Sequence, residues 1–247
     1  MNLKVNTAVD LIIPARDEEA TIGSLLSALP WPILRHVIVA DNGSVDQTAA
    51  VARAGGAQVV FEPQRGYGAA CLRALAQIAR HPPLVVTFID GDLADDPAQL
   101  PRIIEPIVRG RADLVIGSRP RLAEPGALNA AQRIGNMVAC GLIGRLTGVA
   151  YRDLGPFRAI RHASLQALSM SDRTWGWTVE MQFKAALVGL QTVQIDVPYR
   201  CRAGGKSKIS GSIVGGTRAG CRMALTIARL WHAQLRTAHG RSRPAGC

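Results

Sequence analysis

The 247-residue chain is poor in aromatic residues, has no long uninterrupted apolar run and has no paired cysteines. Phe, Trp and Tyr make up 4% of the sequence. Nucleic-acid-binding surfaces usually interleave aromatic with basic side chains, so no nucleic-acid partner is expected. No run of about 18 apolar residues occurs, and the nearest candidate, residues 134–150, is broken by Arg145 and several glycines. We therefore expect no membrane-spanning helix.

The cysteines are odd in number and widely scattered, with no CxxC pair: Cys71, Cys140, Cys201, Cys221 and Cys247. This spacing supports neither a disulfide framework nor a zinc site, and a reducing compartment is the default. The first residues, MNLKVNTAVDLIIPARDEE, lack a charged start followed by a long apolar core, so we expect no signal peptide. The sequence predicts a cytoplasmic protein.

Acidic residues are missing from the last fifth of the chain. Residues 1–196 carry 19 basic and 18 acidic groups, whereas residues 197–247 carry ten basic groups and no acid; the net charge is +11. A field of one sign suggests an anionic partner, such as substrate phosphates or an anionic membrane surface. A solvated tail is a weak explanation for four basic residues that lie close together: Arg200, Arg202, Lys206 and Lys208.

Residues 209–236 have the pattern of an amphipathic helix. Apolar residues such as Ile227 and Trp231 alternate with arginines such as Arg229. Such a helix can lie in a membrane interface or pack on the rest of the protein, and the pattern alone leaves both alternatives open.

Short β-rich runs alternate with helix-like segments over the first 120 residues. Strands are expected at residues 9–14, 36–40, 58–61, 84–89 and 113–117, and helices at 18–29, 45–54, 68–80 and 97–109. Near-continuous apolar strands that alternate with helices predict an α/β fold with a Rossmann-like, mostly parallel sheet flanked by helices. Ser44 and Gln47 are expected to form a capping box, and Gly55 and Gly56 to end that helix.

Polar groups follow the carboxyl ends of these strands, where ligands bind in parallel sheets. Asp90-Gly91-Asp92 follows a buried strand, and its glycine permits a sharp turn. Two carboxylates in this arrangement suit a divalent cation such as Mg²⁺, whose coordination shell substrate phosphates would complete. A turn with solvated acids would explain the same three residues, because Asp and Gly are common in turns. A turn also explains Gly43 and Ser44, but it does not require the acid at Asp41, which can bind a base or ribose.

Gly66-Tyr67-Gly68 opens a helix whose free N–H groups could face a phosphate. It is not a GxGxxG motif, and no GxxxxGK[ST] loop occurs. NAD and ATP binding are therefore not expected. A sugar-nucleotide pyrophosphorylase would have a glycine-rich basic loop after the first strand, where this chain is acidic and free of glycine.

Eight segments occur in the order and rough spacing of one enzyme family: IIPARDEE, VADNGSVDQT, RGYGAA, FIDGDLADDP, VIGSR, DLGPFRAI, GWTVEMQFKAA and YRCRAGGKSKISG. From about residue 9 to 213 the chain resembles the family 2 glycosyltransferases, above all the branch of polyprenyl-phosphate sugar synthases. The resemblance implies a GT-A fold and inverting transfer from a UDP- or GDP-linked sugar. It also implies one glycosyltransferase domain over residues 1–247, with a core at 9–213, the amphipathic helix at 209–236 and a flexible basic tail at 237–247.

The resemblance also implies roles for individual residues. The nucleotide-sugar pocket would be lined by Pro14, Arg16, Glu18, Asp41, Asp90, Gly91, Asp92 and Arg119. Asp90 and Asp92 would hold Mg²⁺ or Mn²⁺ and the donor diphosphate. Arg202 and Lys208, in an R-x-x-G-x-S-K segment, would neutralise the leaving diphosphate or an acceptor phosphate. Glu180 occupies the place of the acid in the acceptor-side helix.

The chain departs from the family pattern at two positions. Asp17 stands where the family often has Asn, and Ala94 stands where a metal-binding Gln is common, so Asp95 is a candidate substitute. Trp175 and Trp177 are expected to line an acceptor pocket or to pack in the core.

The acceptor stays open at this point. A polyprenyl phosphate is favoured, which fits a peripheral position at the inner face of a membrane. A hydroxyl acceptor would need a general base, for which Glu180 is the candidate.

Overall fold

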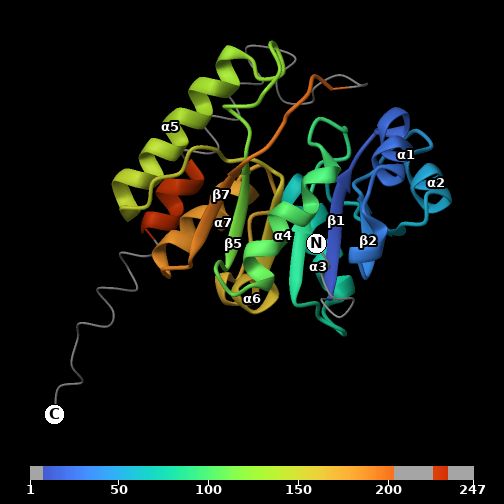
Figure 1. Cartoon of the computed structure of the whole chain (residues 1–247), viewed down its shortest axis with the longest axis horizontal. Helices are drawn as coiled ribbons and strands as arrows, with labels where there is room; N and C mark the ends of the chain where they lie inside the picture. The colour runs from blue at the N-terminus through green and yellow to red at the C-terminus, as the bar shows by residue number, and fades with distance from the viewer. Residues whose placement is uncertain (1–7, 203–224, 233–247) are drawn as a thin grey trace.

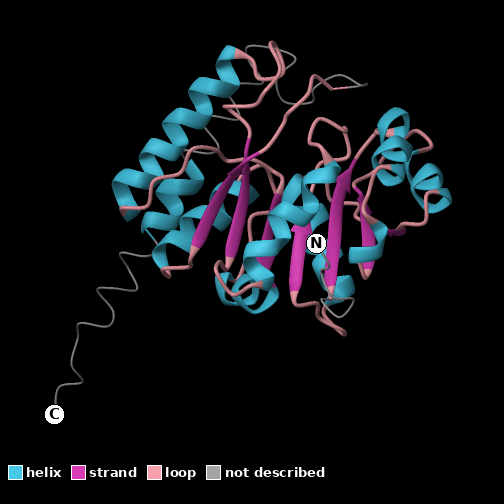
Figure 2. Ribbon diagram, viewed as in Figure 1, coloured by secondary structure: helices cyan, strands magenta, loops and turns pink. Residues whose placement is uncertain are grey.

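The computed structural model describes residues 8–202 and 225–232. Within them a seven-stranded sheet has the order β3-β2-β1-β4-β6-β5-β7. Figure 2 shows the strands in magenta, with helices around them. Its strands are β1 (Val9–Ala15), β2 (His36–Asp41), β3 (Gln58–Phe61), β4 (Val85–Phe88), β5 (Leu114–Ser118), β6 (Arg158–Arg161) and β7 (Thr192–Asp196). Only β6 runs antiparallel to its neighbours β4 and β5. The other strands of this sheet therefore end at one common edge.

Helices cover both faces of the sheet (Figure 1). One face carries α1 (Glu19–Ser27), α2 (Thr48–Ala54) and α4 (Leu100–Val108). The other carries α3 (Tyr67–Ile78), α5 (Ala130–Thr147), α6 (His162–Leu168) and α7 (Trp177–Leu187). Two 3₁₀ turns, η1 (Trp31–Ile33) and η2 (Pro97–Gln99), lie between these elements.

The apolar strands fill two cores at once. In β1, Leu11 and Ile13 pack on the α1 and α4 side, whereas Ile12 packs with Phe88 on the α3 and α7 side. Successive side chains of a strand point to opposite faces, so a strand buried on both faces must be apolar at nearly every position. This explains the near-continuous apolar runs and confirms the predicted α/β, mostly parallel sheet.

The five expected strands are confirmed to within one residue at each end. The four expected helices are also present, the last of them as η2 followed by α4. The capping box at Ser44 and Gln47 is wrong. The Ser44 hydroxyl accepts a hydrogen bond from the Asp17 N–H at 3.0 Å, and α2 begins only at Thr48. The expected end of this helix is confirmed, with Gly56 at φ +88°.

Beyond residue 120 the structure adds elements that the sequence pattern did not predict. β6 and β7 complete the sheet, and α5, α6 and α7 cover one face of it. α5 begins with a capping box between Asn129 and Gln132 and ends at Gly148, whose φ is +77°.

Residues 225–232 are helical and pack on the rest of the protein. Ile227 is fully buried in the core on the α7 side, and Leu230 and Trp231 pack against that core. The Thr226 hydroxyl donates to Asp172 at 3.3 Å. Packing thus explains the apolar positions Ile227, Leu230 and Trp231, whereas Leu225 is exposed. The rest of the expected helix at 209–236 lies outside the described residues. Among the described residues, no helix has both the length and the apolarity to cross a bilayer.

Candidate active site

The ends of β1, β2 and β4 bring three of the predicted segments into contact. The Asn42 N–H donates to the Ala15 carbonyl at 2.9 Å, which joins the first two segments. The Thr21 hydroxyl donates to the Gly91 carbonyl at 2.9 Å and also contacts the Glu18 carboxylate. A Cβ on Gly91 would lie 3.5 Å from the Glu18 Cγ. The expected nucleoside and diphosphate sides of the site are therefore contiguous.

Asp41 lies at this edge but also organises its own turn. It is 6% exposed, and its Oδ1 accepts a hydrogen bond from the Ser44 N–H at 3.0 Å. Asp17, at a positive φ of 50°, accepts from the Val45 N–H at 2.9 Å and lies 3.5 Å from the Arg16 Nε. The Asp in place of the family's Asn thus ties the β1 and β2 turns together.

Asp92 is buried and forms an ion pair with Arg202, which is 110 positions later in the sequence. Its side chain is 4% exposed, its Oδ1 accepts from the Ala94 N–H at 3.0 Å, and its Oδ2 lies 2.9 Å from the Arg202 Nε. The structure therefore joins the predicted metal ligand with the predicted diphosphate-binding arginine. Lys208, the other basic residue of that segment, lies outside the described residues.

Asp90 has a buried oxygen, Oδ1, with no hydrogen-bond partner among the described residues. Burial, followed by the charge of Asp92, raises the pKa of Asp90 to about 7, although a hydrogen bond from Tyr67 and the charges of Arg202 and Arg119 act in the opposite direction. Two carboxylates held close together repel each other, and a bound cation relieves this repulsion.

Asp95 lies deeper, next to Tyr199, with which it forms an isolated β-bridge. It is 1% exposed, and neither carboxyl oxygen has a hydrogen-bond partner in the described part of the chain. Burial raises the pKa of Asp95 well above its ordinary value, and the neighbouring Arg119 only partly offsets this. Across residues 8–202 and 225–232, no three His, Cys, Asp or Glu side chains are grouped to hold a metal ion, so Asp95 does not complete such a set with Asp90 and Asp92.

Arg119 follows β5 and is fixed by Asp153. Its Nε and Nη2 each donate to an Asp153 oxygen at 2.8 Å, and its backbone N–H donates to the same carboxylate at 2.8 Å. The guanidinium also lies 5.0 Å from the centre of the Tyr199 ring. Burial would lower the pKa of Arg119, but Asp153, Tyr199 and Asp95 together raise that pKa above its ordinary value. Arg119 is thus a permanent cation beside Asp90 and Asp95.

The segment DLGPFRAI holds the Arg119–Asp153 pair in place. Arg158, at the start of β6, is fully buried and donates to the carbonyls of Leu154 and Gly155 and to the side chain of Gln182. Burial lowers the pKa of Arg158 to about 10. These bonds hold the loop that carries Asp153, a site residue that sequence reasoning missed although it begins one of the quoted motifs.

Glu180, on α7, is 1% exposed and fully engaged. Its carboxylate accepts hydrogen bonds from the N–H and hydroxyl of Ser171 and from the N–H of Asp172, and it lies 2.7 Å from the Lys184 Nζ. Burial alone would raise its pKa, but these donors lower the pKa of Glu180 below its ordinary value. The carboxylate therefore anchors the loop at residues 169–176.

That loop closes the start of α3. The N–H groups of Gly68 and Ala69 donate to the carbonyls of Thr174 and Arg173, each at 3.0 Å. A Cβ on Gly68 would lie 1.9 Å from the Asp172 carbonyl oxygen, so only glycine allows the loop to pack here. The expectation that these N–H groups face a phosphate is wrong, because backbone carbonyls already occupy them.

Tyr67 connects this loop to the carboxylate pair, and sequence reasoning missed it within RGYGAA. Its ring lies 6.1 Å from that of Trp175, and Tyr67 is close enough to Asp90 to act on the pKa of that carboxyl, which it lowers. Trp175 is partly exposed beside it. Trp177 is 1% exposed and meets the Phe88 ring edge-on at 6.2 Å, so of the two alternatives for Trp177 packing in the core is the one observed.

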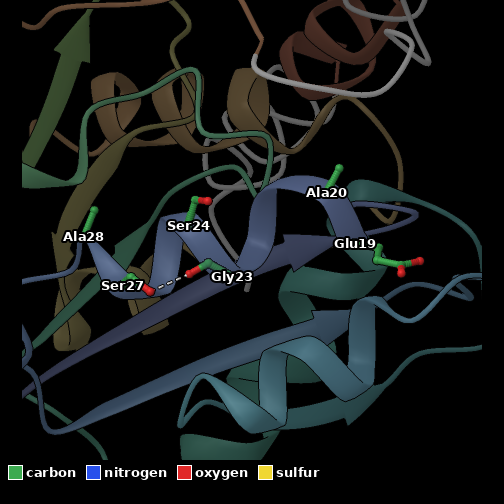
Figure 3. A pocket seen from close by; sticks show the side chains of 6 residues that line it. All are labelled: Glu19, Ala20, Gly23, Ser24, Ser27 and Ala28. Atoms are coloured by element: carbon green, nitrogen blue, oxygen red, sulfur yellow. Dashed lines mark hydrogen bonds between the residues drawn. The ribbon is translucent and has the colours of Figure 1, made fainter.

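A shallow pocket lies along the outer side of α1, away from these groups (Figure 3). Its lining comes from one helix: Glu19, Ala20, Gly23, Ser24, Ser27 and Ala28. None of the predicted site residues lines it.

Comparison with known proteins defines the class. The family model described as Glycosyl transferase family 2 matches residues 10–166. The chain is 37% identical over 208 residues to an uncharacterised glycosyltransferase of Mycobacterium tuberculosis (strain ATCC 25618 / H37Rv), covering 84% of this chain and 92% of the relative. It is 30% identical over 223 residues to an undecaprenyl-phosphate mannosyltransferase of Micrococcus luteus, covering 83% and 88%.

A solved structure of glucosyl-3-phosphoglycerate synthase from M. tuberculosis, in complex with Mn²⁺, UDP-glucose and phosphoglyceric acid, has the same fold. It superposes with a TM-score of 0.72 at 22% identity, covering 92% of this chain and 80% of that one. The expected GT-A fold is thereby confirmed. The chain belongs to glycosyl transferase family 2 and is a glycosyltransferase.

Proposed function

We propose that this glycosyltransferase moves a sugar, with inversion at the anomeric carbon, from a UDP- or GDP-linked donor to a polyprenyl phosphate. The observation that carries the proposal is the Asp92–Arg202 pair beside Asp90: carboxylates next to a guanidinium suit the binding of a diphosphate together with a divalent cation. The similarity to an undecaprenyl-phosphate mannosyltransferase over most of both chains supports the lipid-phosphate acceptor.

The residues present fit a divalent cation, Mg²⁺ or Mn²⁺. The Asp90 Oδ1 is buried without a hydrogen-bond partner among the described residues, and Asp92 directs an oxygen at Arg202. Mg²⁺ is typically bound by one or two carboxylates together with substrate phosphates, so a pair of acids is sufficient. When bound, the cation would neutralise the negative charge of the diphosphate as it leaves.

The remaining residues take roles in binding and in stabilising charge. Glu18, beside Gly91, and Asp41 would contact the nucleoside, together with Pro14 and Arg16. As the bond to the anomeric carbon breaks, negative charge grows on the diphosphate. A guanidinium beside the diphosphate stabilises that charge. Arg202 would provide this stabilisation, with Lys208 and the permanently charged Arg119 in support.

The state of Glu180 supports an acceptor that needs no base. A phosphate acceptor arrives ionised, whereas a hydroxyl acceptor must lose a proton to a free carboxylate. The Glu180 carboxylate is buried, accepts three hydrogen bonds from Ser171 and Asp172, and is paired with Lys184. We assign Glu180 a positioning role, through the loop whose Trp175 lies against Tyr67.

A second candidate is transfer to a hydroxyl group of a small phosphorylated acceptor. One observation favours it: 118 residues are 34% identical to the glucosyl-3-phosphoglycerate synthase of Mycolicibacterium smegmatis, over 42% of this chain. The lipid-phosphate relative matches about twice that share, so we place this candidate second.

The test is a transfer assay with the full chain. UDP- and GDP-sugars are offered with Mn²⁺, Mg²⁺ or a chelator, and with a short-chain polyprenyl phosphate, 3-phosphoglycerate or a free sugar as acceptor. We expect metal-dependent formation of a polyprenyl-phosphate sugar. Efficient transfer to 3-phosphoglycerate or to the free sugar, with none to polyprenyl phosphate, would contradict the proposal and return the role of base to Glu180.

A further inference from the structure

α5 is the outermost helix at the β7 end of the sheet, and it is amphipathic in an unusual way (Figure 1). Its inner side is buried in the core through Ala139, Cys140 and Ile143. Its outer side exposes three large apolar side chains: Ile134 at 57%, Met137 at 66% and Val138 at 59%. Exposed apolar side chains that stand alone are ordinary, but three on one helix mark an interaction surface.

These side chains form one continuous strip. At 3.6 residues per turn, positions 134, 137, 138 and 141 fall on the same side of a helix. Position 141 is Gly141, where an added Cβ would meet no heavy atom within 4 Å. The strip is therefore not covered by any described part of the chain.

The strip is bordered by positive charge. α5 contains no Asp or Glu, and its two charged residues, Arg133 and Arg145, are both exposed. Of the five arginines between residues 119 and 152, Arg119 pairs with Asp153, and Arg121 and Arg152 pair with Asp196; among the described residues Arg133 and Arg145 form no ion pair, and they provide the positive charge beside the strip. Apolar side chains flanked by arginines on one helix are typical of a helix that lies in the interface of an anionic bilayer.

The helix is also fixed relative to the candidate active site. Leu128, just before its N-cap, packs with Ala94 and Tyr199 beside the Asp90–Asp92 turn. Asn136 accepts from the Leu154 N–H at 2.8 Å and donates to the Arg152 carbonyl at 3.1 Å, on either side of Asp153 in the sequence. A surface that binds the outer side of α5 would thus lie at a set orientation to the site.

We propose that the outer face of α5 docks on an anionic lipid bilayer. Ile134, Met137 and Val138 enter the interface, and Arg133 and Arg145 pair with lipid phosphates. The charge pattern favours a bilayer over a second copy of the chain, because a two-fold pairing of this face would gather arginines without acids. The role of this docking rests on the proposed function: docking would bring the active site to an acceptor phosphate whose lipid tail stays in the membrane.

The test uses flotation of the full chain with phosphatidylcholine vesicles, alone or mixed with phosphatidylglycerol, at low and high salt. Wild type is expected to float with the anionic vesicles only, and less at high salt. Met137→Ser/Val138→Ser should weaken this binding about tenfold or more, because two apolar side chains no longer leave water. Arg133→Gln/Arg145→Gln should weaken binding at low salt more than at high salt and so reduce the salt dependence, of which the basic residues at 197–247 keep a share.

Matched controls keep the result specific. Ile134→Ser should weaken binding, whereas Phe61→Ser should not: both side chains are 57% exposed, but Phe61 lies on β3, at the opposite end of the sheet. Circular dichroism and unchanged transfer to a short, water-soluble polyprenyl phosphate would show that the variants are folded. Vesicle binding by Met137→Ser/Val138→Ser equal to wild type overturns the inference. So does a wild-type dimer, seen by light scattering, that this variant splits without loss of vesicle binding.

The two proposals fail separately. Transfer to polyprenyl phosphate with no effect of the α5 variants on vesicle binding leaves the proposed function in place and removes the inference. Vesicle binding that depends on α5, without any transfer to polyprenyl phosphate, supports the docking surface and removes the proposed acceptor.

Discussion

The Nε of Arg202 lies 2.9 Å from the Oδ2 of Asp92. Asp92 thus contacts a guanidinium where a metal ion was expected, and Arg202 contacts a carboxylate where a diphosphate was expected. The Asp92 side chain is 4% exposed and that of Arg202 30%, which makes this a largely buried ion pair. On the proposed function, a divalent cation bound at Asp92 would displace Arg202, whose guanidinium would then be available to a diphosphate. Binding of metal and donor should therefore be coupled through this pair.

Arg202→Ala should separate metal binding from turnover. Without the competing guanidinium, Mn²⁺ should bind more tightly in the absence of nucleotide, by about tenfold, which is the equivalent of 1.4 kcal/mol. Turnover should fall by about 10²-fold or more, since a group that stabilises charge in the transition state is lost. Calorimetry with Mn²⁺ and single-turnover rates measure the two effects.

The control is Arg200→Ala. Arg200 lies two residues away, its side chain is 56% exposed, and it is 4.0 Å from Asp96 rather than at the carboxylate pair. Neither Mn²⁺ affinity nor turnover should change there. Lys208→Ala is expected to lower turnover more than donor affinity. A wild-type single-turnover rate of the Arg202 or the Lys208 variant would remove that residue from the stabilisation of the leaving diphosphate.

Asp92→Asn should abolish transfer and leave the fold intact. The amide can still accept from the Ala94 N–H, which is the only backbone bond that the Asp92 side chain makes in the described structure. The charge that holds a cation is lost, so turnover should drop by about 10³-fold, a loss of similar size to that of other groups that stabilise charge at reaction centres.

Asp96→Asn is the matched control for Asp92→Asn. Asp96 lies on the same loop and accepts from the Ala98 N–H at the start of η2. Its turnover should stay near wild type. A chelator-sensitive wild type combined with near-normal turnover of Asp92→Asn would remove the metal assignment.

The carboxylate pair could be located from sequence because it directly follows a recognisable buried strand, and ligands bind at the carboxyl ends of such strands. The residues of β4 are all buried and apolar or Thr, so the strand is recognisable, and its carboxyl end must lie at the ligand-binding edge. Asp90 and Asp92 follow directly. By contrast, the capping box failed because Ser44 bonds Asp17, a residue 27 positions away that no local pattern includes.

The second half of the site depends on contacts between distant residues. β6 begins and ends with arginine, which hides its strand character, although Arg158 is fully buried. β7 does alternate, with Val193 and Ile195 packed against the core, and this pattern could have identified it. Because β6 lies between β4 and β5, its omission also hid Asp153 as the partner of Arg119.

Asp41→Ala should weaken binding of the matching nucleoside diphosphate about tenfold, on the hypothesis that the carboxylate bonds the base or ribose. The loss of one hydrogen bond to a charged group has about this effect. Calorimetry with UDP and GDP measures it. Asp46→Ala is the control, because Asp46 also bonds the N–H groups of this turn, at Glu19 and Thr48, without lying at a strand end. Equal dissociation constants for wild type and Asp41→Ala would leave Asp41 as a turn residue.

Glu180→Gln tests whether this buried acid positions a loop or takes a proton. The pKa of Glu180 is lowered in the folded protein by Lys184 and by donors from Ser171 and Asp172. Its contribution to stability is therefore present above the ordinary carboxyl pKa of 4.5 and is lost as the pH falls through the lower folded value. The variant should unfold at a lower temperature than wild type at neutral pH, and the gap should narrow as the pH falls below 4.5.

The size of the activity change then decides between the two roles of Glu180. Loss of a general base costs about 10²- to 10⁴-fold in turnover. If Glu180 only anchors residues 169–176, turnover with a polyprenyl phosphate should fall less than about tenfold, because the loop still reaches Tyr67 through Trp175 and the amide can replace part of the hydrogen bonding. Glu105→Gln is the control: Glu105, on α4, pairs with Arg109 and Arg111, which follow that helix, and its replacement should leave turnover unchanged. A large loss of turnover without the pH-dependent loss of stability would make Glu180 the base and a hydroxyl group the acceptor.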